Sequence, residues 1–351
     1  MKKQLKILSL IDVPWNSGLT DYAIKQAKAL EKTGYEVFFG ATERTLCLER
    51  IKKEGFTAIY ISDRKKLNLL GDILKIRNFA KKRKIDILNA HTGRTQTIAI
   101  LSATRTNLKI IRTKADAKTP RISLLSGRIS KIICASAYIQ QMYTRRGISE
   151  NKVEIIPPPA PKMDIPLPGF KPPIIIGILA RLDPVKGHRY FLDAAALLTS
   201  RNEKVEFEIG GYEANTKYPE LKKYADKLGI VNKVHFYGEV KQPEDFIKRC
   251  DIGIITSTGS EAVSRVLLEW LSAGRPVIST NVGCVPEILK EDFLCPPGRP
   301  DIMAEKIHRL LNSPSLLRMV SLQNKDLALK KYSFETFSCH TEAIFRKGCE
   351  T

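Results

Sequence analysis

The chain has 351 residues and carries 58 basic against 37 acidic side chains, which gives a formal net charge of +21. With 43% hydrophobic and 27% charged residues, the composition excludes a disordered protein, and the length is sufficient for two domains that each have a core. The seven cysteines are scattered and include no Cys-x-x-Cys pair. This pattern excludes a disulfide framework and a zinc site, and it favours a reducing, cytosolic setting.

The positive charge is concentrated in one half of the chain. Residues 1–170 hold 32 basic and 14 acidic side chains, a net charge of +18, whereas residues 171–351 hold 26 and 23, a net charge of +3. This asymmetry predicts a polyanionic partner for the first half, such as a phosphorylated lipid, a membrane surface or nucleic acid. A generally lysine-rich proteome is the alternative, but it does not explain why one half is singled out.

The first half alternates short apolar runs with longer helical patterns. The opening residues have a basic start and an apolar run too short to span a membrane, so they indicate a first buried strand and not a signal peptide. A helix is predicted within 20–34, because Ala23, Ala27 and Leu30 recur at helical spacing and Gly34 closes the pattern. Strands are predicted at 6–11, 36–41, 57–62, 86–91, 109–113, 131–136 and 153–157.

A proline-rich segment at 157–173 separates the two halves, and since proline is excluded from helix interiors and central strands, we expect a linker over 161–173. The strand pattern then resumes. Alternating strands and helices predict an α/β fold with two Rossmann-like parallel-sheet domains, 1–160 and 174–331, whose cleft is the expected ligand site. The strands predicted in the second domain are 174–180, 205–211, 234–240, 251–257, 276–281 and 293–297.

A helix predicted over about 264–273 places Glu269 inside an apolar run. Gly274 suits the C-terminal cap of this helix, and Pro276 prevents its continuation. Glu261 precedes Glu269 by eight residues, so the two carboxylates are about 80° apart around the helix axis and both point away from the main apolar stripe. Such carboxylates can accept sugar hydroxyls, and free N–H groups at a helix start can hold a phosphate. The spacing alone leaves open the alternative of two surface glutamates.

Residues 260–289, SEAVSRVLLEWLSAGRPVISTNVGCVPEIL, resemble the signature region of retaining nucleotide-sugar glycosyltransferases of family 4. That region has two glutamates separated by seven residues, then a small residue, Gly, Arg or Lys, Pro and Val, and finally a Gly-x-x-Pro-Glu turn. The resemblance implies that Glu269 holds the ribose hydroxyls of the donor and that Glu261 contacts the donor sugar. It also implies donor contacts at the helix start, from Ser264, Arg265 and Val266. The family often has Gly-Phe-Gly after the first glutamate, whereas this chain has Ala-Val-Ser at 262–264, which leaves the donor sugar open.

Residues 176–198 resemble the Gly-x-x-x-Arg-Leu-x-x-x-Lys-Gly segment of the same family. The resemblance implies that Arg181 and Lys186, two cations beside a helix start, stabilise the charge that develops on the leaving diphosphate. In the first domain, Gly18 would let the backbone approach the donor phosphates. His91, at a strand end, would lie near the donor sugar and the acceptor hydroxyl. The structural alternatives are a solvated loop for the cations, a simple turn for the glycine and a structural role for the histidine.

Two further donor contacts are implied by the resemblance. Val240, at the end of the strand 234–240, would touch the donor base through its backbone, and Gly210 would lie beside the donor, although the family separates its two glycines by one residue. The chain contains no Asp-x-Asp pair, which transferases that clamp a diphosphate with a metal generally need, and its five histidines are scattered. We therefore expect no metal and no other cofactor.

In the resembling family the first domain binds the acceptor, and here it carries two strongly basic stretches. Residues 64–84 have nine basic residues, one acidic residue and an apolar stripe, and residues 105–131 have eight basic residues and one acidic residue. These stretches favour a lipid-linked or phosphorylated glycan as the acceptor, together with peripheral contact to the anionic cytoplasmic face of an inner membrane. A solvated basic face is the alternative. Nucleic acid is not expected, because the stretches lack interleaved aromatic residues and a binding motif.

The resemblance as a whole implies a GT-B architecture, with a terminal helix over 332–351 that crosses back to the first domain. It implies a retaining transferase that moves a sugar from a nucleotide-sugar to a hydroxyl acceptor, in lipopolysaccharide or other surface-polysaccharide synthesis. The leaving phosphate would help to deprotonate the acceptor, so no protein nucleophile is assigned. Two alternatives remain: a nucleotide-sugar epimerase on the same fold, and a non-catalytic protein that binds polyanions or membranes. The basic first domain and the pair of glutamates count against the first, and the retained site residues count against the second.

Overall fold

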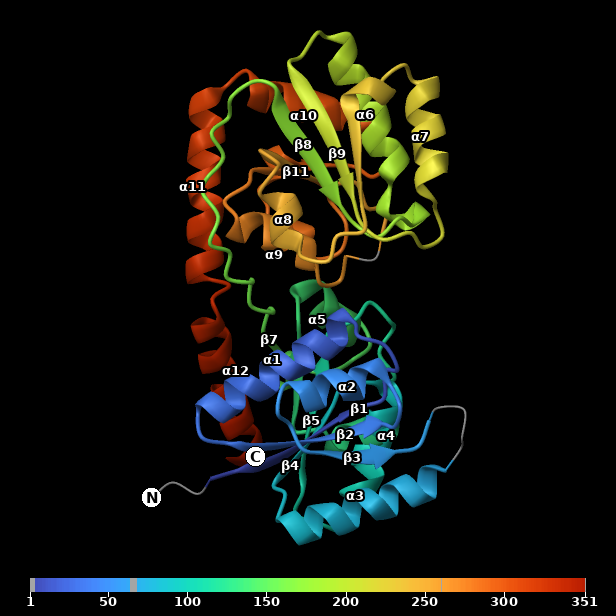
Figure 1. Cartoon of the computed structure of the whole chain (residues 1–351). Helices are drawn as coiled ribbons and strands as arrows, with labels where there is room; N and C mark the ends of the chain where they lie inside the picture. Colours follow the sequence, from blue (N-terminus) through green and yellow to red (C-terminus); the bar gives the residue numbers. More distant parts are fainter. Residues whose placement is uncertain (1–3, 64–67, 260, 351) are drawn as a thin grey trace. The chain divides into compact units, whose positions relative to one another are not determined.

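The structure is a computed structural model that describes residues 4–63, 68–259 and 261–350, and its chain divides into two compact units. The N-terminal unit comprises the chain up to Pro158 together with the residues from Phe334 onward, and the C-terminal unit comprises Pro159–Ser333. Each unit is a parallel sheet covered by helices (Figure 1). The predicted fold class, two Rossmann-like α/β domains, is therefore confirmed.

The sheet of the N-terminal unit has seven parallel strands in the order β3-β2-β1-β4-β5-β6-β7. Each strand predicted in the first half is present, because continuous apolar runs suit strands that are buried on both faces. The strands are β1 (Lys6–Ile11), β2 (Glu36–Thr42), β3 (Ala58–Ile61), β4 (Ile87–Ala90), β5 (Lys109–Lys114), β6 (Lys131–Cys134) and β7 (Val153–Ile155).

Helices connect these strands and begin at side-chain caps. The hydroxyl of Ser17 accepts the N–H of Thr20 at the start of α1, and the carboxamide of Asn68 accepts the N–H of Gly71 at the start of α3. The first residues of the basic stretch predicted over 64–84, including Leu67, lie outside the described residues. The helices are α1 (Gly18–Lys32), α2 (Leu46–Lys53), α3 (Leu69–Arg83), α4 (Gly93–Ser102) and α5 (Ala137–Thr144), with the 3-10 helices η1 (Leu124–Arg128) and η2 (Glu150–Lys152).

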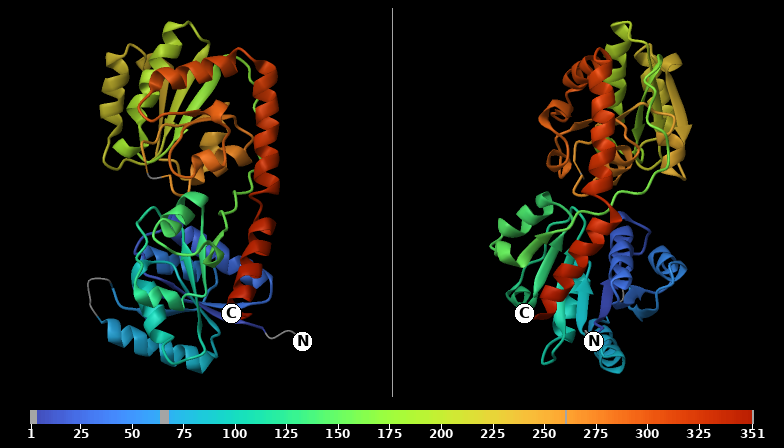
Figure 2. Two further views of the ribbon diagram at one scale, coloured as in Figure 1. Left: turned by 180° about the vertical axis from the view of Figure 1, so that it is seen from behind. Right: turned by 90° about the vertical axis from the view of Figure 1, so that its left-hand side faces the viewer.

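The terminal helix α12 (Phe334–Glu350) belongs to the N-terminal unit, where it packs against α1 and β5 (Figure 2). The hydroxyl of Ser338 donates to the carbonyl of Ala29 at 3.1 Å. The rings of Tyr22 and Phe337 meet edge to face, with centroids 5.5 Å apart. The last residues of the chain thus complete the core of the unit that its first residues begin.

The sheet of the C-terminal unit has six parallel strands in the order β10-β9-β8-β11-β12-β13. One apolar cluster packs α6 and α10 on the sheet, and a second cluster packs α8 and α9 on it. The strands are β8 (Ile174–Leu179), β9 (Val205–Gly210), β10 (Val234–Gly238), β11 (Ile252–Ile255), β12 (Val277–Thr280) and β13 (Leu294–Cys295). The helices are α6 (His188–Ser200), α7 (Tyr218–Lys227), α8 (Pro243–Ile247), α9 (Arg265–Ser272), α10 (Pro300–Leu311) and α11 (Pro314–Lys330), and the 3-10 helices are η3 (Pro184–Lys186), η4 (Val231–Lys233), η5 (Val285–Glu287) and η6 (Glu291–Phe293).

The proline-rich segment predicted as a linker over 161–173 contains no helix or strand, but it is packed onto the C-terminal unit. Met163 and Ile165 are buried in the apolar cluster that contains α9. The guanidinium of Arg275 donates from Nη1 to the carbonyl of Pro166 at 2.9 Å. The segment is therefore an extended part of the C-terminal unit along most of its length.

In the described part of the chain, no helix combines the length and the apolar character that a bilayer crossing requires.

Candidate functional site

The site residues of the C-terminal unit gather where the strand order of its sheet reverses. β8 and β11 are neighbours in the sheet, and their following loops run in opposite directions. In open α/β sheets, ligands bind outside the carboxyl ends of the strands at such a point. Lys186 lies in the loop after β8, and Glu261 lies in the loop after β11.

The loop after β8 is shaped by one acidic cap and one glycine. The carboxylate of Asp183 accepts the N–H of Val185 at 3.0 Å and begins the single turn of η3. Gly187 has φ +69°, and a Cβ there would lie 2.1 Å from the carbonyl oxygen of Thr256. Only glycine allows this approach, which brings Lys186 next to the end of β11. Arg181 is half-exposed in the same loop, with its Nε 3.6 Å from a carboxylate oxygen of Asp183.

Lys186 and Glu261 form a direct ion pair. The side chains are only 16% and 3% exposed, so the pair is shielded from bulk water and interacts strongly. The hydroxyl of Ser257 donates to the same carboxylate oxygen at 2.7 Å, and the hydroxyl of Thr256 donates to the carbonyl of Lys186 at 2.8 Å. These two hydroxyl residues were missed by the sequence analysis, although both lie at the end of the strand predicted at 251–257.

The backbone of Glu261 is held by a second close approach. Gly283 has φ +58°, and a Cβ there would lie 2.2 Å from the carbonyl oxygen of Glu261, which accepts the N–H of Cys284 at 2.8 Å. The Gly-x-x-Pro-Glu turn seen in the sequence is therefore in contact with the backbone of the first glutamate. This contact explains why a glycine is needed at position 283, because any side chain there would displace Glu261.

α9 follows as predicted, with Ser264 at its N-cap and Ala273 at its C-cap. Trp270 is completely buried, whereas Glu269 is half-buried on the flank of the helix. The carboxylate within the apolar run is therefore not part of the core. At the start of the helix, the hydroxyl of Ser264 is buried without a hydrogen-bond partner among the described residues. The next two predicted donor contacts differ in exposure: Arg265 is exposed and Val266 is half-buried.

Gly210 and Val240 lie together at the neighbouring end of the same sheet. A Cβ on Gly210 would lie 2.6 Å from the ring of Phe246 and 2.9 Å from a methyl group of Val240, so no side chain fits at that position. Gly210 ends β9, and Val240 is half-buried just after β10. These two residues, both implied as donor contacts, are thus brought together.

The remaining two predicted site residues belong to the N-terminal unit. Gly18 is the first residue of α1, which follows β1. His91 follows β4 and is completely buried, with Nε2 2.7 Å from the hydroxyl oxygen of Ser9 and 3.1 Å from the amide nitrogen of Asn89. Burial, aided by the positive charge of Arg112, lowers the pKa of His91 to about 3. The ring is therefore neutral at physiological pH and faces the interior.

The buried neutral His91 should make the N-terminal unit sensitive to acid. Because the unfolded chain binds a proton near pH 6.5 and the folded unit does so only near pH 3, stability is lost as the pH falls through this interval. Between about pH 7.5 and about pH 5, this histidine accounts for a loss of about 2 kcal/mol. We expect His91→Gln to show a correspondingly smaller decrease in urea-unfolding free energy between these pH values. His340→Gln, which changes an exposed histidine of the same unit, should leave the decrease unchanged, and an equal effect of both variants would contradict the assignment.

Within residues 4–63, 68–259 and 261–350, no group of three His, Cys, Asp or Glu side chains is arranged so that it could hold a metal ion.

Comparison with known families matches both units. Residues 16–161 match the family Glycosyltransferase Family 4, and residues 164–326 match Glycosyl transferases group 1. Together the two matches include each of the predicted site residues.

Individual relatives are distant in sequence. The alpha-D-kanosaminyltransferase of Streptomyces kanamyceticus is 26% identical over 181 residues, which are 50% of this chain and 46% of that enzyme. The chain spans about half the length of the curated relatives it matches. Among solved structures, Anabaena HepE in complex with UDP has a TM-score of 0.84 at 18% identity, over 97% of this chain and 100% of that one. The lipopolysaccharide outer core galactosyltransferase WaaB, in its apo form, has a TM-score of 0.80 at 16% identity, over 98% and 100% of the two chains.

Proposed function

The chain belongs to the family-4-like glycosyltransferases of the GT-B fold, and on this premise we propose that it transfers a sugar from a nucleotide-sugar donor to a hydroxyl group of a glycan or lipid-linked acceptor. The observation that carries the proposal is the shielded pair of Lys186 and Glu261 at the reversal point of the C-terminal sheet. One cation and one carboxylate meet there, which suits a substrate that has a diphosphate at one end and sugar hydroxyls at the other.

Each site residue has one role in this proposal. Lys186 and Arg181 stabilise the negative charge on the leaving diphosphate, and Glu261 accepts hydroxyl groups of the donor sugar. Glu269, at the flank of α9, accepts the two hydroxyl groups of the ribose. Gly210 and Val240, which lie together at the neighbouring strand ends, contact the donor, with the backbone of Val240 next to the base. Gly18 lets the backbone of the N-terminal unit approach the donor.

We propose that the transfer retains the configuration at the anomeric carbon. The bond from the anomeric carbon to the phosphate oxygen breaks as the bond to the acceptor oxygen forms on the same face. The acceptor proton passes to the leaving phosphate oxygen, so no protein side chain acts as a nucleophile. The positive charge needed by the diphosphate comes from Arg181 and Lys186, and the sequence has no Asp-x-Asp pair, so no metal is included in this proposal. His91, neutral and directed inward, supports the strand end next to the acceptor and does not transfer the proton.

The acceptor in this proposal belongs to lipopolysaccharide or another surface polysaccharide, assembled at the cytoplasmic face of the inner membrane. Two facts support this finer proposal. The similar structure WaaB is a lipopolysaccharide outer core galactosyltransferase, and the first 170 residues of this chain carry a net charge of +18. A cationic surface attracts anionic glycans and anionic lipid headgroups, with a strength that falls as salt is added.

Nucleotide-sugar turnover tests the proposal. UDP-, GDP- and ADP-sugars are incubated with the protein and with membranes that carry acceptor, while nucleoside diphosphate and labelled product are followed. We expect one donor to be consumed only when acceptor is present. Conversion of a donor to its epimer without acceptor would indicate an isomerase, and absence of nucleotide release with every donor would contradict a transferase.

Glu269→Ala tests the ribose contact with the same donor. Hydrogen bonds to a charged group are worth about 1.5–3 kcal/mol, so the dissociation constant of the donor should rise about tenfold to a hundredfold. Glu305→Ala is the matched control, because it removes a carboxylate that is 64% exposed from another helix of the same unit. Isothermal titration calorimetry of both variants measures the dissociation constant of the donor. If Glu269→Ala lowers thermal stability but leaves donor affinity unchanged, the ribose role is wrong.

A further inference from the structure

Two cationic side chains are buried on one face of the N-terminal sheet, at the carboxyl end of β5. Arg112 is 3% exposed and Lys114 is 2% exposed. They are two residues apart in the strand, so their side chains leave the same face of the sheet. Both belong to the end of the strand at which parallel sheets bind ligands, yet neither takes part in the donor site of the C-terminal unit.

Only one of the two cations is balanced by a protein carboxylate. Lys114 is paired with the carboxylate of Asp116 and also donates to its carbonyl at 3.0 Å. Among the described residues, Arg112 has no ion-pair partner: its Nη1 donates to the carbonyls of Ala90 and Thr113, and its Nε is buried without a partner. A buried guanidinium without a counter-ion is costly, so the local structure has one positive charge in excess.

A second buried arginine among the described residues, Arg275, provides a comparison, because its guanidinium is fully hydrogen-bonded to the protein backbone. Arg275 is 2% exposed, and all three of its guanidinium nitrogens donate to backbone carbonyls. The acceptors are the carbonyls of Ile247, Pro166, Ala273 and Lys248. Arg112 uses only one of its three nitrogens in this way. The comparison indicates that packing alone does not account for Arg112.

The surroundings of Arg112 are polar and also incomplete. The hydroxyl of Tyr143 on α5 is buried beside the guanidinium of Arg112. Burial raises the pKa of Tyr143, and the charge of Arg112 together with a hydrogen bond between the two side chains opposes this rise. Burial lowers the pKa of Lys114 to about 8, and Arg112 adds to this lowering while Asp116 opposes it. The buried Nε–H of Arg112 has no acceptor among the described residues, and no carboxylate balances the positive charge of this guanidinium. An unused donor on such a charge is the feature of an anion site whose occupant is not part of the protein.

We propose that Arg112 and Lys114 bind a phosphate group of the acceptor, and that the carboxylate of Asp116 takes the place of the phosphate at Lys114 when no acceptor is bound. The inference rests on the proposed function, since it names the class of acceptor for that transfer. A phosphate monoester carries a charge of about −1.5 to −2 at neutral pH, which balances both cations once Asp116 has left, whereas a carboxylate would balance only one. The unpartnered Nε of Arg112 can donate to a phosphate oxygen, and Lys114 supplies a point charge.

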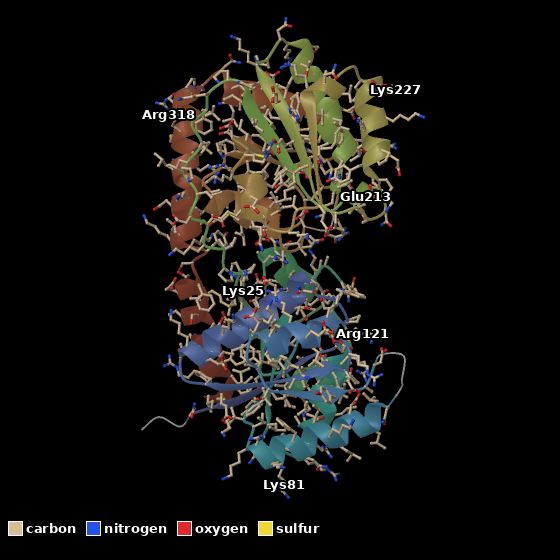
Figure 3. The ribbon with its side chains drawn as sticks, in the orientation of Figure 1. Lys25, Lys81, Arg121, Glu213, Lys227 and Arg318 are labelled. Carbon is tan, nitrogen blue, oxygen red and sulfur yellow. The ribbon has the colours of Figure 1, made fainter. Side chains whose placement is uncertain are left out.

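The position of Asp116 allows this exchange. Its side chain is 26% exposed, and the residues that follow it, 117–119, are exposed. The same carboxylate accepts the N–H of Lys118 at 2.8 Å, so it closes a local turn that can open without disturbing the sheet. Arg121, farther along the same loop, is exposed and lies over the start of α4, where its Cδ would be 3.1 Å from a Cβ on Gly93 (Figure 3). It provides a third cation outside the buried pair.

The test measures binding of labelled inorganic phosphate to the full chain by equilibrium dialysis. Arg181→Ala and Lys186→Ala are present in every sample, so that the phosphate site of the donor does not contribute. We expect Arg112→Met and Lys114→Met each to weaken binding at least tenfold. We expect Asp116→Asn to strengthen it about tenfold, because the competing carboxylate is gone. Arg128→Met, which removes an exposed cation of the same unit, should change binding less than twofold.

Asp116→Asn keeps the proposal testable if Arg112→Met fails to fold. A carboxylate that competes with phosphate and a carboxylate that only stabilises Lys114 predict different changes in phosphate binding for this variant. If Asp116 only stabilises Lys114, its replacement lowers stability and does not tighten phosphate binding. Unchanged binding in folded Arg112→Met and Lys114→Met, or unchanged or weaker binding in Asp116→Asn, would overturn the proposal. Because dialysis uses neither donor nor catalysis, its outcome is independent of whether sugar transfer is detected.

Sedimentation with vesicles of phosphatidic acid and phosphatidylcholine identifies which molecule carries the phosphate, because phosphatidic acid presents a phosphate monoester at the membrane surface. If Arg112→Met loses both vesicle binding and phosphate binding, the bound group is a lipid headgroup. If it loses phosphate binding and keeps vesicle binding, the phosphate belongs to a glycan. Both results support the site, whereas loss of vesicle binding in Arg128→Met to the same extent as in Arg112→Met would show general surface attraction and contradict it.

Discussion

Replacement of Lys186 by alanine is expected to lower the rate of sugar transfer by about 10²–10³-fold, which is the effect of removing one preorganised charge that stabilises a developing anion. The side chain is 16% exposed and is held by Glu261, while its carbonyl is fixed by the hydroxyl of Thr256. This geometry exists before substrate arrives, so little reorganisation is needed when negative charge forms on the leaving diphosphate. The initial rate of nucleotide release at saturating donor and acceptor is the measurement.

The same substitution leaves a buried carboxylate with fewer partners, so a loss of activity must be separated from a loss of stability. Glu261 would retain only the hydroxyl of Ser257 among the side-chain contacts described above. We expect the double variant Lys186→Met, Glu261→Gln to recover most of the unfolding free energy, because it removes both charges of the pair. Its transfer rate should remain at least as low as that of Lys186→Ala. A double variant that regains activity would show that Lys186 only stabilises the loop.

The strands were predictable because their signal is local. Most strands of the two parallel sheets contain a short apolar run, such as Ile7–Leu8 in β1 and Ile174–Ile176 in β8. α9 was predictable for the same reason, since Gly274 and Pro276 mark its end and its apolar residues follow a helical period. The resemblance to the family signature then assigned the candidate site residues to these elements.

Contacts between distant residues were not predictable from these patterns. The pairing of Lys186 with Glu261 depends on two strands being neighbours and on Gly187 and Gly283 allowing the backbones to approach. The inward orientation of His91 depends on Ser9 and on the sheet register, which no local pattern contains. Composition identified the segment 161–173 as irregular, but not that it packs onto the C-terminal unit.

Charge patterns were the least informative about position. In the stretch KIIRTK, Arg112 and Lys114 are two residues apart, as on the solvent face of a half-exposed strand, yet both are buried. The sequence analysis counted them within a basic surface stretch. Their burial depends on the tertiary fold, which places Tyr143 of α5 beside Arg112 and Asp116 beside Lys114. The basic residues of the first half therefore fall into two groups. Exposed residues such as Arg128 can attract an anionic surface, whereas the buried Arg112 and Lys114 can bind a specific anion.

Trp270→Ala is expected to destabilise the C-terminal unit by about 3–5 kcal/mol, the usual effect of truncating a large buried aromatic side chain. The indole is completely buried and fills the space that Gly253 of β11 leaves open, since a Cβ there would lie 2.4 Å from the ring. It also meets Phe246 with ring centroids 6.3 Å apart. At about 2–4 °C per kcal/mol for a unit of this size, the calorimetric transition of the C-terminal unit should fall by about 10 °C.

Trp270→Phe separates the volume of the side chain from its polarity. The indole Nε1 is buried without a hydrogen-bond partner among the described residues, so phenylalanine loses volume but no hydrogen bond, and we expect it to cost less than half of what alanine costs. Both variants retain Trp15, which is 57% exposed in the N-terminal unit. Its fluorescence therefore reports the unfolding of that unit. If the transition temperature of the N-terminal unit falls as far as that of the C-terminal unit, the two units unfold cooperatively. If only the transition temperature of the C-terminal unit falls, the packing that stabilises β11 and positions Glu261 lies within the C-terminal unit alone.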